Sequence, residues 1–110
     1  MKQSYYIIDV KDYRGFRVVL TKKKWQEKSI KHPELRNKKF LKNIKEAIKN
    51  PNQVWQDYSD KKNKRCYYKK YSVMFYIKVV IWMNKPCRVV TAFEIDRIKE
   101  EQYTGLKRLK

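Results

Sequence analysis

The chain has 110 residues, of which 42% are hydrophobic and 15% aromatic; this is enough for one folded domain and argues against a disordered chain or two domains. Its 29 Lys and Arg face only 11 Asp and Glu, and a net charge of +18 favours a polyanionic partner, most often nucleic acid. The longest apolar run, residues 79–83, is too short to cross a bilayer, and residues 1–8 lack the apolar core of a secretory signal, so we expect a cytoplasmic protein without membrane contact.

The first part of the chain predicts a β-hairpin followed by a helix. Residues 4–10 and 16–20 are rich in Tyr, Ile and Val, and the turn-forming residues between them predict two short paired strands. Thr21 is a typical N-cap residue, and Pro33 disfavours helical geometry at the residue before it. A helix is therefore predicted over residues 22–31.

A second helix is predicted from Pro33 to Lys49, because proline is tolerated in a first helical turn and apolar residues then recur at steps of three and four. The turn-forming residues 50–52 end this helix. The recurring residues form one stripe that faces the core: Leu35, Phe40, Leu41, Ile44, Ala47 and Ile48.

The second half of the chain predicts strands. Aromatic and β-branched residues form four runs separated by turns, at residues 53–59, 65–71, 73–83 and 87–95. Val54 is expected to face inward from the first run, and Tyr58 could do so too. Val73 and Phe75 are expected to share one face of the third run, whose two faces are both largely apolar, as in a central strand.

The predicted fold class is α+β, with an N-terminal hairpin and two helices followed by an antiparallel sheet of about four strands. Few glycines and prolines interrupt the chain, so residues 1–110 are expected to form a single domain. Residues 96–110 predict no more than a short strand or helix, with a basic tail from about residue 104 that could be flexible.

The two cysteines, Cys66 and Cys87, form no C-x-x-C pair, and the chain has a single histidine. This composition predicts neither a metal site nor a bound cofactor. Both thiols are expected to be reduced and to pack as small apolar groups on strands.

The single histidine, His32, lies between the two predicted helices, beside Glu34 and Lys31. The sequence contains no G-x-S-x-G elbow, phosphate-binding glycine loop or H-E-x-x-H pair, which argues against hydrolases of those classes. RNA cleavage requires less, because the 2′-hydroxyl of the substrate is an internal nucleophile. A histidine, a cation and a hydroxyl suffice for it without a metal ion.

Basic residues occur in every part of the chain. Single clusters usually form only a solvated face, but the total charge predicts at least one strongly positive surface. Tyr67, Tyr68 and Tyr71 alternate with lysines and could stack on bases or pack on neighbouring strands. The residues expected to contact nucleic acid are Lys23, Lys24, Lys31, Arg65, Lys69, Lys70 and Tyr71.

Several short motifs follow one another between residues 25 and 93. In chain order they are Trp25, His32-Pro33-Glu34, residues 44–48, Asn50-Pro51, Tyr67-Tyr68, residues 79–81 and residues 89–93. Their order and spacing resemble the barnase–EndoU–colicin–RelE-like (BECR) superfamily, in its phage-borne and toxin-type nuclease branch. The resemblance implies early helices, a four-stranded antiparallel sheet and metal-independent RNA cleavage by a toxin or phage effector, which an antitoxin or immunity protein restrains.

The resemblance also implies candidate catalytic residues. His32 matches the catalytic histidine, and Thr91 matches the hydroxyl residue of the last core strand. Glu34 follows the histidine but could instead stabilise a helix N-terminus, and Thr91 could simply fill a strand. The catalytic cation stays open among Arg36, Lys31, Arg65, Lys78 and Arg88.

Three hypotheses follow. In the first, the chain is a ribonuclease in which His32 transfers protons and Arg36 or another cation stabilises the phosphorane. Thr91 and Tyr68 then orient the phosphate, and the product is a 2′,3′-cyclic phosphate. In the second, the chain is a nonenzymatic RNA- or DNA-binding module; in the third, it is an inactive interaction protein of the same fold. The oligomeric state is not predicted.

Overall fold

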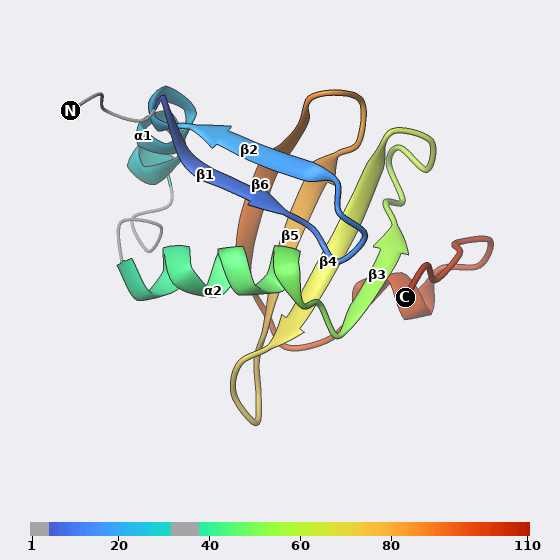
Figure 1. Cartoon of the computed structure of the whole chain (residues 1–110). Coiled ribbons are helices and arrows are strands. Elements are labelled where there is room, and N and C mark those ends of the chain that lie inside the picture. Colours follow the sequence, from blue (N-terminus) through green and yellow to red (C-terminus); the bar gives the residue numbers. More distant parts are fainter. Residues whose placement is uncertain (1–4, 32–37) are drawn as a thin grey trace.

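The computed structural model describes residues 5–31 and 38–110, which form one six-stranded sheet with its two α-helices on one face (Figure 1). The strands are β1 (Tyr6–Lys11), β2 (Arg17–Thr21), β3 (Gln53–Gln56), β4 (Lys64–Lys70), β5 (Tyr76–Trp82) and β6 (Cys87–Ile95). The helices are α1 (Lys22–Lys31), α2 (Lys38–Lys49) and the short 3-10 helix η2 (Lys99–Gln102). Across the sheet the order is β1-β2-β6-β5-β4-β3.

The predicted arrangement of the strands is wrong, although the fold is α+β as expected. The N-terminal hairpin is not separate from the sheet, because β2 pairs with β6 in parallel, while every other neighbouring pair is antiparallel. The sheet is therefore mixed and has six strands instead of about four. This pairing protects the edge of β6, and it joins segments far apart in sequence, which local patterns do not reveal.

Local side chains explain the hairpin and the start of α1. The Asp12 carboxylate accepts hydrogen bonds from the backbone N–H groups of Arg14 and Phe16, each at 2.9 Å, and so closes the β1–β2 turn. The Thr21 hydroxyl accepts a hydrogen bond from the backbone N–H of Lys24 at 3.1 Å. Thr21 is therefore the N-cap of α1, as predicted, and α1 has the predicted bounds.

The helix α2 covers one face of the sheet (Figure 1). Its apolar stripe is confirmed for the described residues, because Phe40, Ile44, Ala47 and Ile48 are buried and Leu41 packs against the same core. Leu35 and the predicted start of this helix lie outside the described residues. No helix in the described part of the chain is long and apolar enough to span a membrane.

The other face of the sheet carries a smaller core, formed by Cys66, Tyr68, Val80 and Ile98. Helix η2 follows Ile98 directly, and its Glu100 is buried. Beyond it, the chain runs beside β3, where the backbone N–H of Leu109 donates to the Val54 carbonyl at 2.7 Å. Both cysteines are free and buried, as expected.

Two of the predicted strands are shorter than expected. β3 ends at Gln56, and Tyr58, which could have faced inward, is 62% exposed. β5 begins only at Tyr76, so Val73 and Phe75 do not face the core but lie in the exposed β4–β5 loop. The Ser72 hydroxyl accepts a hydrogen bond from the backbone N–H of Phe75 at 3.1 Å and so forms a turn. This turn interrupts the apolar run that predicted one long strand.

Candidate nucleic-acid interface

A groove of about 510 Å³ opens where β2 and β6 separate. The two strands pair only through Val18 with Cys87 and Val19 with Arg88. Beyond these pairs, the next residues of both strands line the groove from opposite sides: Leu20 and Thr21 from β2, and Val89 and Val90 from β6. The groove therefore lies at the seam between the N-terminal hairpin and the last strand.

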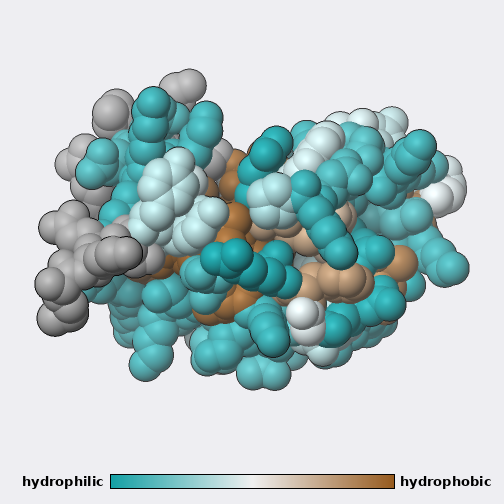
Figure 2. Space-filling model, turned by 45° about the horizontal axis from the view of Figure 1, so that its top comes forward, coloured by the Kyte–Doolittle hydropathy of each residue, from teal (hydrophilic) through white to brown (hydrophobic). Residues whose placement is uncertain are grey.

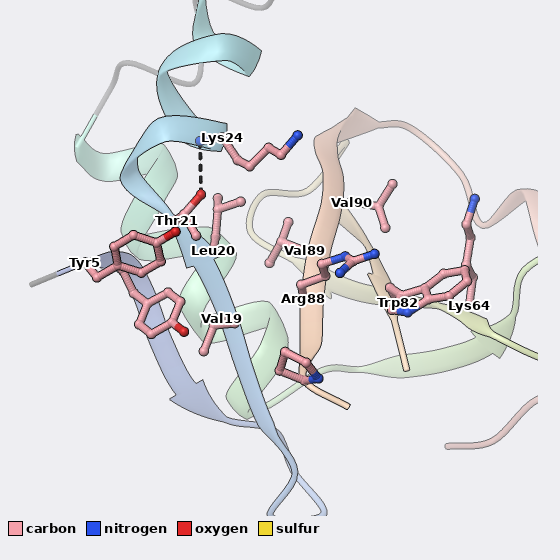
Figure 3. Close-up of a pocket in the computed structure, with 12 residues that line it drawn as sticks. Tyr5, Val19, Leu20, Thr21, Lys24, Lys64, Trp82, Arg88, Val89 and Val90 are labelled. Carbon is pink, nitrogen blue, oxygen red and sulfur yellow. Dashed lines mark hydrogen bonds between the residues drawn. The ribbon is translucent and has the colours of Figure 1, made fainter. Parts of the chain in front are cut away.

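The walls of the groove are aromatic and basic. Tyr5, Thr21 and Lys24 lie on one side of it, and Arg88, Trp82 and Lys64 lie on the other (Figure 3). The Arg88 guanidinium lies over the Trp82 ring, 5.6 Å from its centroid, and Trp82 pairs with both Arg88 and Lys64 across the sheet.

The charge of the groove is uniformly positive. Lys24, Lys64 and Arg88 line it, and among the described residues no carboxylate does. In the view of Figure 2, hydrophilic side chains cover most of the surface, and apolar surface shows mainly in a central band between them. The ammonium and guanidinium groups suit phosphates, and the aromatic rings between them suit unpaired bases.

The structure brings only part of the sequence-predicted site to this groove. Lys24 lines it, and Lys23 is exposed next to Lys24 on α1. Thr91 follows the groove residue Val90 on β6 and is half-buried. His32, Glu34 and Arg36 lie outside the described residues, as does the side chain of Lys31.

The remaining predicted residues lie on β4 or directly after it. Arg65 is half-buried, and one of its guanidinium nitrogens, Nη1, has no hydrogen-bond partner. Lys69 is half-buried, and Lys70 is exposed near the β4–β5 loop. In that loop, desolvation and a hydrogen bond to Glu94 raise the pKa of Tyr71 to about 12. None of these residues lines the groove.

Tyr68 is fully buried, and its hydroxyl donates a hydrogen bond to Glu100. Burial, followed by this hydrogen bond, raises the pKa of the Tyr68 hydroxyl. Glu100 also accepts a hydrogen bond from the Lys78 ammonium at 2.7 Å, so the two charges form a buried ion pair. Burial opposes ionisation of Glu100, but the bonds from Lys78 and Tyr68 outweigh it and hold the pKa of Glu100 below its ordinary value.

One group of side chains beside this ion pair has the spacing of metal ligands. Ligand atoms of Asp57, Cys66 and Glu100 lie within 4.8 Å of one another. However, the Lys78 ammonium already neutralises Glu100, and burial raises the pKa of the Cys66 thiol, which disfavours the thiolate that a metal would need. The residues present therefore do not fit a metal ion.

Most of the groove could not be predicted from the sequence. Tyr5, Tyr6, Lys64 and Trp82 were not candidates, and Arg88 was only one of several possible cations. One feature of the sequence could have pointed to Trp82. It ends a strand with two apolar faces, directly before a turn, and Trp is a residue type that is enriched at interfaces. Tyr5 and Tyr6 meet these residues through the unpredicted pairing of β2 with β6.

Comparison with known protein families supports a nucleic-acid substrate. A family model described as phage-Barnase-EndoU-ColicinE5/D-RelE like nuclease2 matches residues 9–109, which is nearly the whole chain. The chain belongs to this nuclease family. No curated protein and no solved structure matches it.

Membership in this nuclease family confirms the BECR resemblance and supports a nuclease function in general. The match begins within β1, at residue 9, and ends at Leu109, so it includes the groove-lining residues except Tyr5 and Tyr6. A positively charged groove is the surface that a nuclease needs for a phosphodiester chain.

Proposed function

We propose that this protein is a ribonuclease that binds a single-stranded segment of RNA in the β2–β6 groove. The observation that carries the proposal is the groove itself: three cations and three aromatic rings converge in it without a carboxylate among the described residues. Phosphates suit the cations, and the rings of Tyr5, Tyr6 and Trp82 suit unpaired bases. Family membership supplies the reaction class, which is nucleic-acid cleavage.

In this proposal, the 2′-hydroxyl attacks the adjacent phosphorus, and the 5′-oxygen leaves as a 2′,3′-cyclic phosphate forms. His32 transfers protons, with Glu34 as the second proton-transfer group, and no metal ion takes part. Thr91 orients the phosphate from β6. We leave Tyr68 out of direct contact with RNA, because its hydroxyl is buried and donates to Glu100.

For the catalytic cation we favour Arg88 over Arg36. Arg88 lies in the groove, three residues before Thr91 on the same strand, and its guanidinium could donate two hydrogen bonds to a phosphorane. The phage-type family description supports an effector carried by a phage or another mobile element. A restraining antitoxin or immunity protein is part of the same proposal.

The test is to incubate total RNA in EDTA with the wild-type protein and with the His32→Ala and Arg88→Met variants. We expect wild-type cleavage to persist in EDTA, with 2′,3′-cyclic phosphate ends. His32→Ala should abolish cleavage while keeping its affinity for 2′-O-methyl RNA, which lacks the nucleophile. Arg88→Met should lose about 100-fold or more in rate, as when an oxyanion donor is removed.

A matched control is Arg97→Met, because Arg97 is exposed and does not line the groove. Undiminished cleavage by His32→Ala would refute the catalytic assignment. Salt-dependent binding of RNA or DNA by the wild-type protein, without strand scission in EDTA or with divalent ions, would instead support the nonenzymatic binding module.

A further inference from the structure

A second aromatic surface lies outside the groove. The rings of Tyr58 and Tyr103 are stacked, with centroids 4.3 Å apart and planes inclined by 24°. Both side chains are nevertheless well exposed, Tyr58 by 62% and Tyr103 by 40%. Stacked rings that remain open to solvent offer a flat face on which a further ring can stack.

Basic side chains surround this tyrosine pair. Lys61 and Lys62 are exposed in the turn that follows Tyr58, and the Lys61 ammonium lies beside Gly105. Lys107 is exposed as well, and its backbone pairs with Gln56, two residues before Tyr58. Asp57 and Asp60 flank Tyr58, but both are half-buried and accept hydrogen bonds from Ser59 and Asn63, respectively. Among the exposed charged side chains of residues 57–62 and 101–107, the three lysines outnumber the single carboxylate, that of Glu101.

Backbone and side-chain contacts of helix η2 position the tyrosine pair. Tyr103 follows η2, and its backbone N–H donates to the Glu100 carbonyl at 3.2 Å. The Glu100 carboxylate is anchored in turn by the buried Lys78 and Tyr68. Rings fixed in this way lose little conformational freedom when a ligand stacks on them.

The tyrosine pair and the groove are joined by a continuous row of residues across the sheet. Trp82 of β5 is opposite Lys64 of β4. The Lys64 carbonyl accepts a hydrogen bond from the backbone N–H of Asp57, which precedes Tyr58. Two strand spacings, roughly 10 Å, therefore separate the Trp82 and Asp57 backbones. Lys64 lines the groove and lies between its aromatic wall and the tyrosine pair.

The loops along this row are bonded to each other. The backbone N–H of Met83 donates to the Asn63 carbonyl at 2.7 Å, and the Asn84 side-chain amide donates to the Asn63 side chain at 2.8 Å. These bonds connect the β3–β4 turn to the β5–β6 turn. The relative positions of the groove and the tyrosine pair are therefore fixed by the fold.

We propose that the stacked pair of Tyr58 and Tyr103, with Lys61, Lys62 and Lys107, is a second binding site for a base of the same single-stranded nucleic acid. The strand leaves the groove past Lys64 and stacks a base on the tyrosine pair. This site extends the proposed ribonuclease function: it selects substrates with an unpaired segment long enough to reach both sites, and it takes no part in the cleavage step.

The experiment compares the affinities of two 2′-O-methyl oligonucleotides, a short one that fills only the groove and one of about 10 nucleotides, within the size range of single-strand sites. The wild-type protein should bind the longer one more tightly. Tyr58→Ala and Tyr103→Ala should each weaken binding of the longer oligonucleotide by about tenfold, as expected for one lost base stack, and leave the short one unaffected. Tyr58→Phe should retain wild-type binding, because it keeps the ring.

The control is Phe75→Ala, because Phe75 is also 40% exposed but lies in the β4–β5 loop, at the opposite end of β5 from Trp82. Wild-type affinity of both tyrosine variants for the longer oligonucleotide would overturn the second site, as would an equal loss for both oligonucleotides. In either case RNA cleavage by the wild-type protein would leave the proposed function standing. A wild-type protein that binds neither oligonucleotide would overturn both proposals.

Discussion

The ion pair of Lys78 and Glu100 carries two opposite charges in the interior of the protein. The two residues are only 7% and 1% exposed, and each charge depends on the other for its stability. Lys78 also lies over the rings of Tyr68 and Phe93, at 5.6 and 5.8 Å from their centroids. Removing one partner leaves an uncompensated charge in an environment of low polarity, which is costly.

Replacing Glu100 with Gln should therefore destabilise the protein at neutral pH by about 3–5 kcal/mol, because Lys78 loses its partner charge. The folded-state pKa of Glu100 is lower than its ordinary value of 4.5. The stabilisation by the ionised carboxylate is thus fully present above pH 4.5 and is lost as the pH falls through the folded-state pKa. Urea unfolding at a series of pH values should show the difference between Glu100→Gln and wild type shrinking in this acid range.

Asp9→Asn is the matched control for this prediction. Asp9 forms an ion pair with Arg17 at 2.8 Å, but both side chains are largely exposed. Its loss should change stability far less than the loss of Glu100. A constant difference between Glu100→Gln and wild type down to the lowest pH would contradict the assigned ionisation of Glu100.

At the scale of elements, the start of α1 depends on one side chain. Thr21 is the last residue of β2, and it both caps α1 and lines the groove. Thr21→Ala should cost about 1 kcal/mol of stability, because the Lys24 backbone N–H loses its acceptor. Thr21→Ser should keep most of that stability, and thermal unfolding of the three proteins measures the difference. Equal destabilisation by Ser and Ala would show that the cap does not matter.

The sequence predicts elements well where a local signal exists. The bounds of α1 and β6 agree with the predicted residues, because Thr21, Pro33 and the turn before Cys87 are strong boundary signals. The run 73–83 lacked such a signal. Its apolar residues predicted one long strand, but the hydrogen bonds of Ser72 form a turn that leaves Val73 exposed. Pattern alone does not distinguish an exposed apolar turn from a buried strand.

The groove was harder to predict than the elements, because it is a product of long-range pairing. Its residues come from the N-terminal segment 5–24 and from residues 64–90, and these two groups meet because β2 lies beside β6. The net charge predicted a cationic surface, yet among the described side chains that were expected to contact nucleic acid, only Lys24 lines this groove. Charge counts predict that a positive surface exists, whereas its position depends on strand order.

At the scale of the whole molecule, the net charge of +18 makes nucleic-acid binding strongly dependent on salt. For a single strand, the logarithm of the binding constant should fall linearly with the logarithm of salt concentration, with a slope of about −0.7 per phosphate contacted. Lys24→Met, Lys64→Met and Arg88→Met should each make this slope shallower by about 0.7. Titrations of 2′-O-methyl RNA at several salt concentrations measure it.

Lys42→Met provides the control for overall charge, because Lys42 is exposed on α2 and does not line the groove. It removes one positive charge as the other variants do. If Lys42→Met and the groove variants changed the slope equally, RNA would be held by diffuse charge and the groove would not be its binding site.

The seam between β2 and β6 has a consequence for biosynthesis. The parallel pairs that create the groove join residues 18 and 19 to residues 87 and 88. A nascent chain emerges from the ribosome N-terminus first, so β1 and β2 are made long before their partner strand. The groove cannot assemble until β6 has been translated. A nascent chain that has not yet reached β6 therefore lacks this cationic surface for nucleic acid.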